Sequence, residues 1–96
     1  MEPEDIEQLR AQLRGPFKTY GVTRAAIFGS VARGDQGPES DVDLLVEFEE
    51  GRSLFDLVLL KEELATILGR EADITTFKGL HPIIREKVMR EQVPLL

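Results

Sequence analysis

Residues 27–34 read IFGSVARG and residues 40–46 read SDVDLLV. Ten residues thus separate a Gly-Ser pair from an Asp-x-Asp triplet. An apolar run precedes the first motif, and another follows the second. Short apolar runs bounded by glycine, serine and aspartate are typical of strands. The pattern predicts two strands of one sheet, with a turn suited to phosphate and a pair of carboxylates between them.

The composition is that of a small acidic domain. The chain has 96 residues, 42% of them hydrophobic, and a net charge of −6, which predicts one domain over residues 1–96 with a single core. Because nucleic-acid backbones require a basic face, this charge argues against direct nucleic-acid binding. The absence of cysteine excludes disulfides and thiolate metal sites. The N-terminus is acidic, unlike a signal peptide, and no apolar stretch reaches membrane-spanning length, so a cytoplasmic protein is expected.

Helices alternating with three strands are predicted along the chain, which favours an α/β (α+β) layered fold. A helix is expected over 3–14, where apolar residues recur at helical spacing, with a break or kink at Gly15-Pro16 and a short turn over 17–20. Gly21 then ends the segment. The remaining elements are expected as a strand over 24–28, a helical turn over 30–33, a loop over 34–40, a strand over 41–48, a helix up to Leu68, a strand over 71–77 and a last helix from Pro82.

The two later helices carry recognisable ends and apolar faces. Ser53, with Asp56 three residues on, resembles a capping box, and Gly69 supplies a C-terminal stop. His81 is expected to cap the last helix. The predicted core faces are Leu54, Leu57, Val58, Leu64, Ile67 and Leu68 in the helix that ends at Leu68, and Ile83, Ile84, Val88 and Met89 in the helix that begins at Pro82.

The Asp-x-Asp triplet predicts a metal site. Side chains two apart on a strand point to the same face, so Asp41 and Asp43 project together while Val42 and Leu44 face the core. Two carboxylates this close repel one another unless a cation is present. Mg²⁺ suits them, because it binds through one or two carboxylates together with substrate phosphates. The alternative interpretation is a polar strand edge that follows a turn.

The Gly-Ser pair predicts a phosphate-binding turn. Gly29 lies where a strand gives way to a helical turn, so backbone can approach a ligand and free N–H groups favour an anion. Ser30 adds a hydroxyl, and Arg33, one helical turn on, can reach the same phosphate. Ser30 as a helix cap and Arg33 paired with Glu39 or an aspartate remain alternatives.

A third carboxylate, Asp73, lies on the strand predicted over 71–77. Its alternation places Ala72 and Ile74 on one face and Asp73 on the other. If this strand lies beside 41–48, Asp73 joins the pair and can hold a metal or orient an attacking hydroxyl. An exposed strand acid is the alternative.

Residues 28–34 and 40–46 together closely resemble the minimal nucleotidyltransferases of the DNA polymerase β superfamily, and in particular the antitoxins of HEPN–MNT toxin–antitoxin pairs. The similarity extends over nearly the whole chain. It implies a small mixed sheet flanked by helices, the polymerase β-like nucleotidyltransferase fold. It also implies a nucleoside triphosphate bound at Gly29, Ser30 and Arg33, and two Mg²⁺ ions held by Asp41, Asp43 and Asp73.

The resemblance further implies an activity and a partner. Relatives of this kind transfer a nucleoside monophosphate, usually AMP from ATP, to a hydroxyl and release pyrophosphate. In toxin-paired members the acceptor is a tyrosine of the HEPN ribonuclease toxin. Larger relatives carry a further domain for the acceptor, and this chain has none, so the acceptor surface is expected to come from another chain, in a homo- or hetero-oligomer.

Two other functions remain open at this stage. The chain can act as a non-catalytic antitoxin that masks the toxin by binding, since its acidic surface suits a basic RNA-binding partner. It can also act as a stand-alone enzyme on a small molecule or an RNA end. The base of the nucleotide is not specified by the motif.

Overall fold

Four strands form one mixed sheet in a computed structural model of the protein, which describes residues 3–29, 32 and 41–96. The strand order is β3-β2-β1-β4, with β2 and β3 parallel and the other neighbours antiparallel. This confirms the expected small mixed sheet flanked by helices. The described elements are α1 (Pro3–Thr19), β1 (Val22–Phe28), β2 (Val42–Phe48), α3 (Leu54–Leu68), β3 (Ala72–Thr76), α4 (Pro82–Glu91) and β4 (Val93–Pro94).

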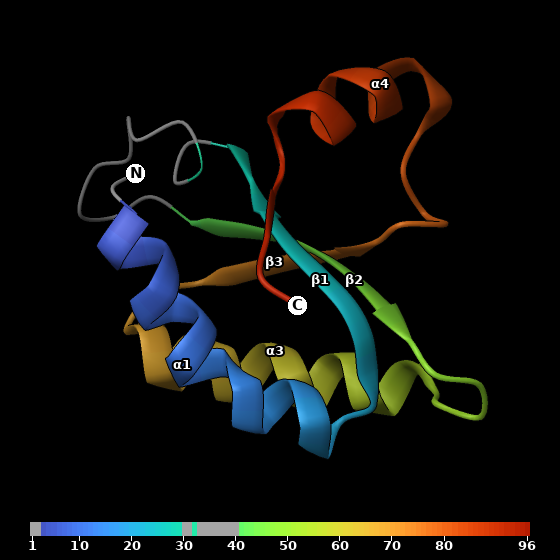
Figure 1. The fold of residues 1–96 in the computed structure, drawn as a ribbon. Helices are drawn as coiled ribbons and strands as arrows, with labels where there is room; N and C mark the ends of the chain where they lie inside the picture. Colours follow the sequence, from blue (N-terminus) through green and yellow to red (C-terminus); the bar gives the residue numbers. More distant parts are fainter. Residues whose placement is uncertain (1–2, 30–31, 33–40) are drawn as a thin grey trace.

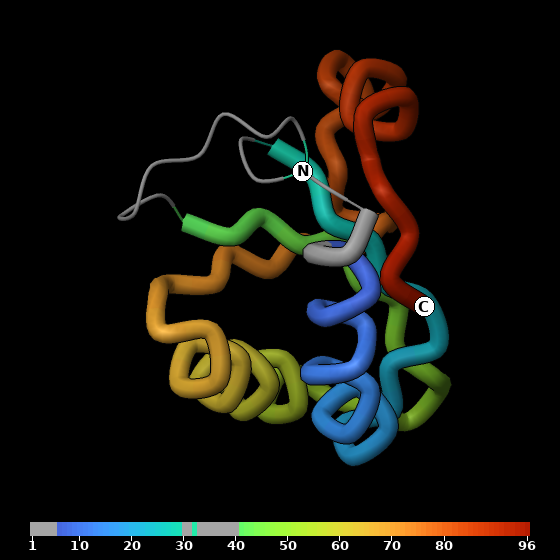
Figure 2. Tube along the Cα trace, turned by 60° about the vertical axis from the view of Figure 1, so that its left-hand side comes forward, coloured from blue at the N-terminus to red at the C-terminus, as the bar shows by residue number. Residues whose placement is uncertain are grey.

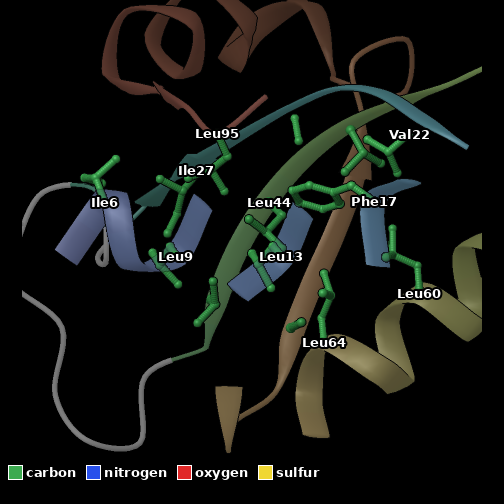
Figure 3. Packing of buried hydrophobic residues seen from close by; sticks show 14 residues of the cluster. Ile6, Leu9, Leu13, Phe17, Val22, Ile27, Leu44, Leu60, Leu64 and Leu95 are labelled. Atoms are coloured by element: carbon green, nitrogen blue, oxygen red, sulfur yellow. The ribbon is translucent and has the colours of Figure 1, made fainter. Parts of the chain in front are cut away.

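The helices lie on both sides of the sheet. α1 and α3 cover one face, and α4 lies over the other (Figure 1 and, from a different side, Figure 2). The main core fills the space between the sheet and the first two helices (Figure 3). Val42, Leu44 and Val46 of β2 point into this core, so the alternate residues of the strand face the opposite side. A second, smaller cluster joins that opposite side to α4 through Ala26, Leu45, Phe77, Leu80 and Val88.

The first helix passes through the position where a break or kink is predicted. α1 continues beyond Gly15-Pro16 to Thr19, so the break is not found. A proline disfavours helical backbone in the preceding residue partly through contact with its Cβ, and glycine has none. Leu13 and Phe17 are also almost completely buried on one side of α1, and this packing outweighs the lost hydrogen bond. Gly21, at φ +73°, ends the segment as expected.

The predicted core faces of the later helices are wrong in part. In α3 the fully buried residues are Leu60 and Leu64, and Leu57 and Leu68 are partly buried, whereas Leu54, Val58 and Ile67 are exposed. In α4, Val88 is buried and Met89 is packed against the second cluster, while Ile83 and Ile84 are exposed. Apolar residues surround more of each helix than one sheet face can cover. The short strand β4 is not among the predicted elements, and its two residues pair with Ala26 and Ile27.

Both predicted helix caps are confirmed. The Phe55 N–H donates to the Ser53 hydroxyl (3.2 Å), and the Ser53 N–H donates to the Asp56 carboxylate (2.9 Å). Gly69 adopts φ +69° at the other end of α3. His81 accepts a hydrogen bond from the Ile83 N–H through Nδ1 (3.2 Å), which agrees with its predicted role. No helix among the described residues is long and apolar enough to cross a membrane.

The capping box makes stability sensitive to acid. The hydrogen bond from the Ser53 backbone, aided by Arg52, holds the pKa of Asp56 below its ordinary value. A carboxylate with a lowered pKa in the folded state stabilises the fold above its unfolded pKa of about 3.9, and this stability is lost as the pH falls through the folded pKa. We expect Asp56→Asn to flatten the decline of Tm between about pH 4 and pH 2. Thermal melts across this range test it, with Glu62→Gln on the same helix as control. Superimposable pH profiles for Asp56→Asn and wild type would contradict the assignment.

Candidate active site

Two of the predicted carboxylates occupy neighbouring positions on parallel strands. Asp43 of β2 is the register partner of Asp73 of β3. Both lie near the beginning of their strands, on the face opposite the main core, because Val42, Leu44 and Ala72 point into that core. Asp43 is half-buried and Asp73 is exposed. The prediction that Asp73 lies beside the Asp-x-Asp triplet is therefore confirmed at the level of strand position.

Asp41 stands directly before β2 and is exposed. It precedes Asp43 by two residues, which places both on the same side of the strand's path. Among the residues that the structure describes, no group of three His, Cys, Asp or Glu side chains is arranged to hold a metal ion. The strands thus bring the three aspartates to one edge of the sheet without assembling them into a closed metal-binding cluster.

Gly29 lies against Asp43. It directly follows β1, whose last residue, Phe28, is the register partner of Asp43, so the end of β1 and the start of β2 are adjacent (Figure 1). A Cβ on Gly29 would overlap the Asp43 Oδ2 atom and lie 3.1 Å from its Cγ, and the backbone φ is +75°. Both the close approach and the positive φ require glycine. The first residue of the predicted phosphate turn is therefore in contact with a predicted metal-binding carboxylate.

The structure describes one further residue of the predicted phosphate turn, Ala32. Ser30 and Arg33 lie outside the described residues, as does the predicted loop over 34–40. Ala32 is described and helical, as the predicted turn over 30–33 requires at that position.

Phe28 is a neighbour of the site to which the sequence alone assigned no role. Its register partner is Asp43, so the two side chains share a face of the sheet. Phe28 is partly buried against the cluster beneath α4. The available signal was strand alternation: Ile27 belongs to the main core, so Phe28 must face the aspartates. Phe28 thus joins the site to the packing beneath α4.

The donor chemistry at this edge of the sheet suits Mg²⁺. Carboxylate oxygens are the ligands that this ion prefers, and one or two of them suffice when substrate phosphates complete its coordination. Asp43 and Asp73 at paired strand positions meet that requirement. The contact between Gly29 and Asp43 also brings backbone that can approach a phosphate next to the carboxylates.

Comparison with known proteins agrees with this geometry. A model of the family described as "Nucleotidyltransferase domain" matches residues 6–94. The chain belongs to this family and is a nucleotidyltransferase. Within the family it is similar to the minimal nucleotidyltransferases, as the motifs indicated.

One relative and two solved structures define this similarity. The protein named "Putative protein adenylyltransferase MJ0435" from Methanocaldococcus jannaschii is 44% identical over 92 residues, which cover 96% of this chain and 99% of that protein. A structure described as a "putative minimal nucleotidyltransferase" superposes with a TM-score of 0.82 at 44% identity, covering 98% of this chain and 96% of the other. An MNT antitoxin complexed with a tri-AMPylated HEPN toxin of Shewanella oneidensis gives a TM-score of 0.66 at 17% identity, covering 100% of this chain and 72% of that chain, a likeness of fold.

Proposed function

We propose that the chain is an antitoxin that transfers AMP from ATP to a tyrosine hydroxyl of a cognate HEPN-type ribonuclease toxin and so silences it. The observation that carries this proposal is the register pairing of Asp43 with Asp73 on one sheet face, with the Gly29 backbone in contact with Asp43. This arrangement provides carboxylates beside a backbone segment that can approach a phosphate. It belongs to a chain whose family transfers nucleotides.

In this proposal Asp41, Asp43 and Asp73 would hold Mg²⁺. The bound ion would neutralise phosphate charge and stabilise the attacking and leaving oxygens. Without a cation, these aspartates would repel both one another and the nucleotide. The three residues therefore act on the triphosphate only in combination with the metal.

The remaining steps fall to residues of the chain. Gly29, Ser30 and Arg33 bind the triphosphate, the first through its backbone and the last as a charged fork. The acceptor hydroxyl oxygen attacks the α-phosphorus, the bond from that phosphorus to the bridging oxygen of the β-phosphate breaks, and pyrophosphate leaves. Asp73, which is more exposed than its register partner Asp43, orients the hydroxyl and takes its proton.

The choice of acceptor is supported by the relatives. One is named as a putative protein adenylyltransferase, and an MNT antitoxin of the same fold is found in a complex with a tri-AMPylated HEPN toxin. The chain itself is small, and the aspartate face is open enough that Asp41 and Asp73 are exposed. An acceptor side chain presented by another protein can therefore reach the carboxylates directly.

The tyrosine acceptor is tested on the toxin. The cognate HEPN-type toxin is incubated with the chain, ATP and Mg²⁺, and its ribonuclease activity is followed. We expect activity to fall with time, and we expect replacement of the modified tyrosine by phenylalanine to abolish AMP incorporation. Incorporation at an unchanged rate in the phenylalanine variant would show that the hydroxyl acceptor lies elsewhere.

A further inference from the structure

The N-terminal half of α3 exposes a contiguous apolar surface. Leu54 is 73% exposed, Phe55 79%, Val58 47% and Leu59 46%. We call these four residues the α3 patch. Their spacing of one, four and five residues places them on one side of the helix. Leu54, Phe55 and Val58 also line a shallow apolar hollow of about 150 Å³. Large apolar side chains gathered in this way mark an interaction surface more often than a chance feature of the exterior.

The α3 patch lies on a different side of the helix from the residues that pack into the main core. Leu60 and Leu64, which pack into the main core, are completely buried on the side facing the sheet (Figure 3). The helix α3 is therefore apolar on two sides, and the described residues cover only one of them. Burying Phe55 alone removes roughly 150–250 Å² of largely apolar surface from water. Covering the patch therefore makes a favourable contribution to the free energy of association.

The charges around the patch indicate the kind of partner. Five acids occur within residues 49–63 against two basic residues: Glu49, Glu50, Asp56, Glu62 and Glu63 against Arg52 and Lys61. Arg52 pairs with two of these acids, since its guanidinium donates to Glu49 (2.9 Å) and Asp56 (3.3 Å), and with five acids against two bases the segment keeps a net charge of −3. A second copy of the chain would bring two acidic rims together, and such like-charge contacts oppose association.

We propose that the α3 patch docks a different protein, one whose surface offers an apolar centre and a basic rim. This inference rests on the proposed function, because an RNA-cleaving toxin needs a basic surface to bind its substrate. The helix α3, which carries the patch, lies in the helical layer on one side of the sheet (Figure 1), whereas strand alternation places the paired aspartates on the other face. Docking and AMP transfer therefore use separate surfaces of the molecule, and a variant can lose one without losing the other.

The test uses the full chain and the cognate HEPN-type toxin. Phe55→Gln with Val58→Gln removes the apolar centre and keeps good helix formers in α3. Ile83→Gln with Ile84→Gln is the matched control, because these residues are exposed apolar side chains of a different helix. We expect the α3 variant to weaken the complex and raise KM for the toxin by about tenfold or more, with kcat unchanged. The α4 control should resemble wild type in both quantities.

Several results would overturn the proposal. Unchanged affinity and KM in the α3 variant, with AMP transfer intact, would show that the patch does not dock the toxin. This result would not contradict the proposed function. The same conclusion follows if the α4 control shows the larger loss, or if light scattering shows that the chain alone dimerises through the patch. A complex that depends on the patch, formed without any AMP transfer by wild type, would support docking and reject the proposed transferase activity.

Discussion

Asp43→Asn is expected to reduce AMP transfer by about a thousandfold, because charge-stabilising groups of this kind contribute on that order. The substitution preserves the size of the side chain but removes the negative charge beside Gly29 and Asp73. Asp41→Asn combined with Asp43→Asn should abolish transfer. The measurement is the initial rate of label transfer from labelled ATP to the toxin, with far-ultraviolet circular dichroism to show that the fold persists.

A matched control is present on the same strand. Glu47 lies four residues beyond Asp43, on the same side of β2, and is exposed. Glu47→Gln makes the same change of charge at the other end of the strand, so its rate should equal that of wild type. A folded Asp43→Asn variant that transfers AMP at the wild-type rate would show that this carboxylate takes no part in the reaction.

Gly29→Ala is expected to affect both stability and activity. A non-glycine residue at φ +75° costs roughly 1–2 kcal/mol of folding free energy. The added methyl group also overlaps the Asp43 carboxylate, which must move. Because misplacing a reacting group by about 1 Å can reduce a rate about a hundredfold, we expect a loss of that size in AMP transfer.

Gly51→Ala separates the two effects. Gly51 has φ +89°, and a Cβ there would meet nothing within 4 Å, so the substitution strains the backbone without touching a side chain. Chemical denaturation should show a similar loss of stability for both variants, while only Gly29→Ala loses transfer activity. An equal loss of activity in the two variants would mean that strain, not the contact with Asp43, is responsible.

The face of β2 on which Asp43 lies could be predicted from the sequence because strand geometry is local and regular. Alternation along residues 41–46 assigned Val42 and Leu44 to the core and Asp43 to the other face, and the structure agrees. The position of Asp73 depended on whether the strand predicted over 71–77 pairs with β2. That is a long-range property, and the motif spacing alone could not supply it.

The errors also have a physical basis. The residues Gly15-Pro16 suggested a break because local propensity opposes helix there, but burial of Leu13 and Phe17 is a tertiary effect that sequence periodicity does not weigh. Helical periodicity likewise assigned Leu54 and Val58 to the core because it identifies apolar residues without showing which of them the sheet can reach. Of the α3 residues that the prediction misplaced, Leu54 and Val58 belong to the α3 patch, and Ile67 lies outside it.

The two proposed surfaces, one for AMP transfer and one for docking, lie on different sides of the sheet. In the described part of the chain, α1 and α3 support one face of the sheet, and Asp41 and Asp73 are exposed on the other side. Recognition of the acceptor through a separate surface would allow the catalytic face to stay open.

The most direct test of the central claim is the intact mass of the toxin after incubation with the wild-type chain, ATP and Mg²⁺. We predict that the toxin gains the mass of one or more AMP units and that the chain itself keeps its original mass. A toxin of unchanged mass in a stable complex with the chain would contradict the claim of AMP transfer and favour neutralisation by binding alone.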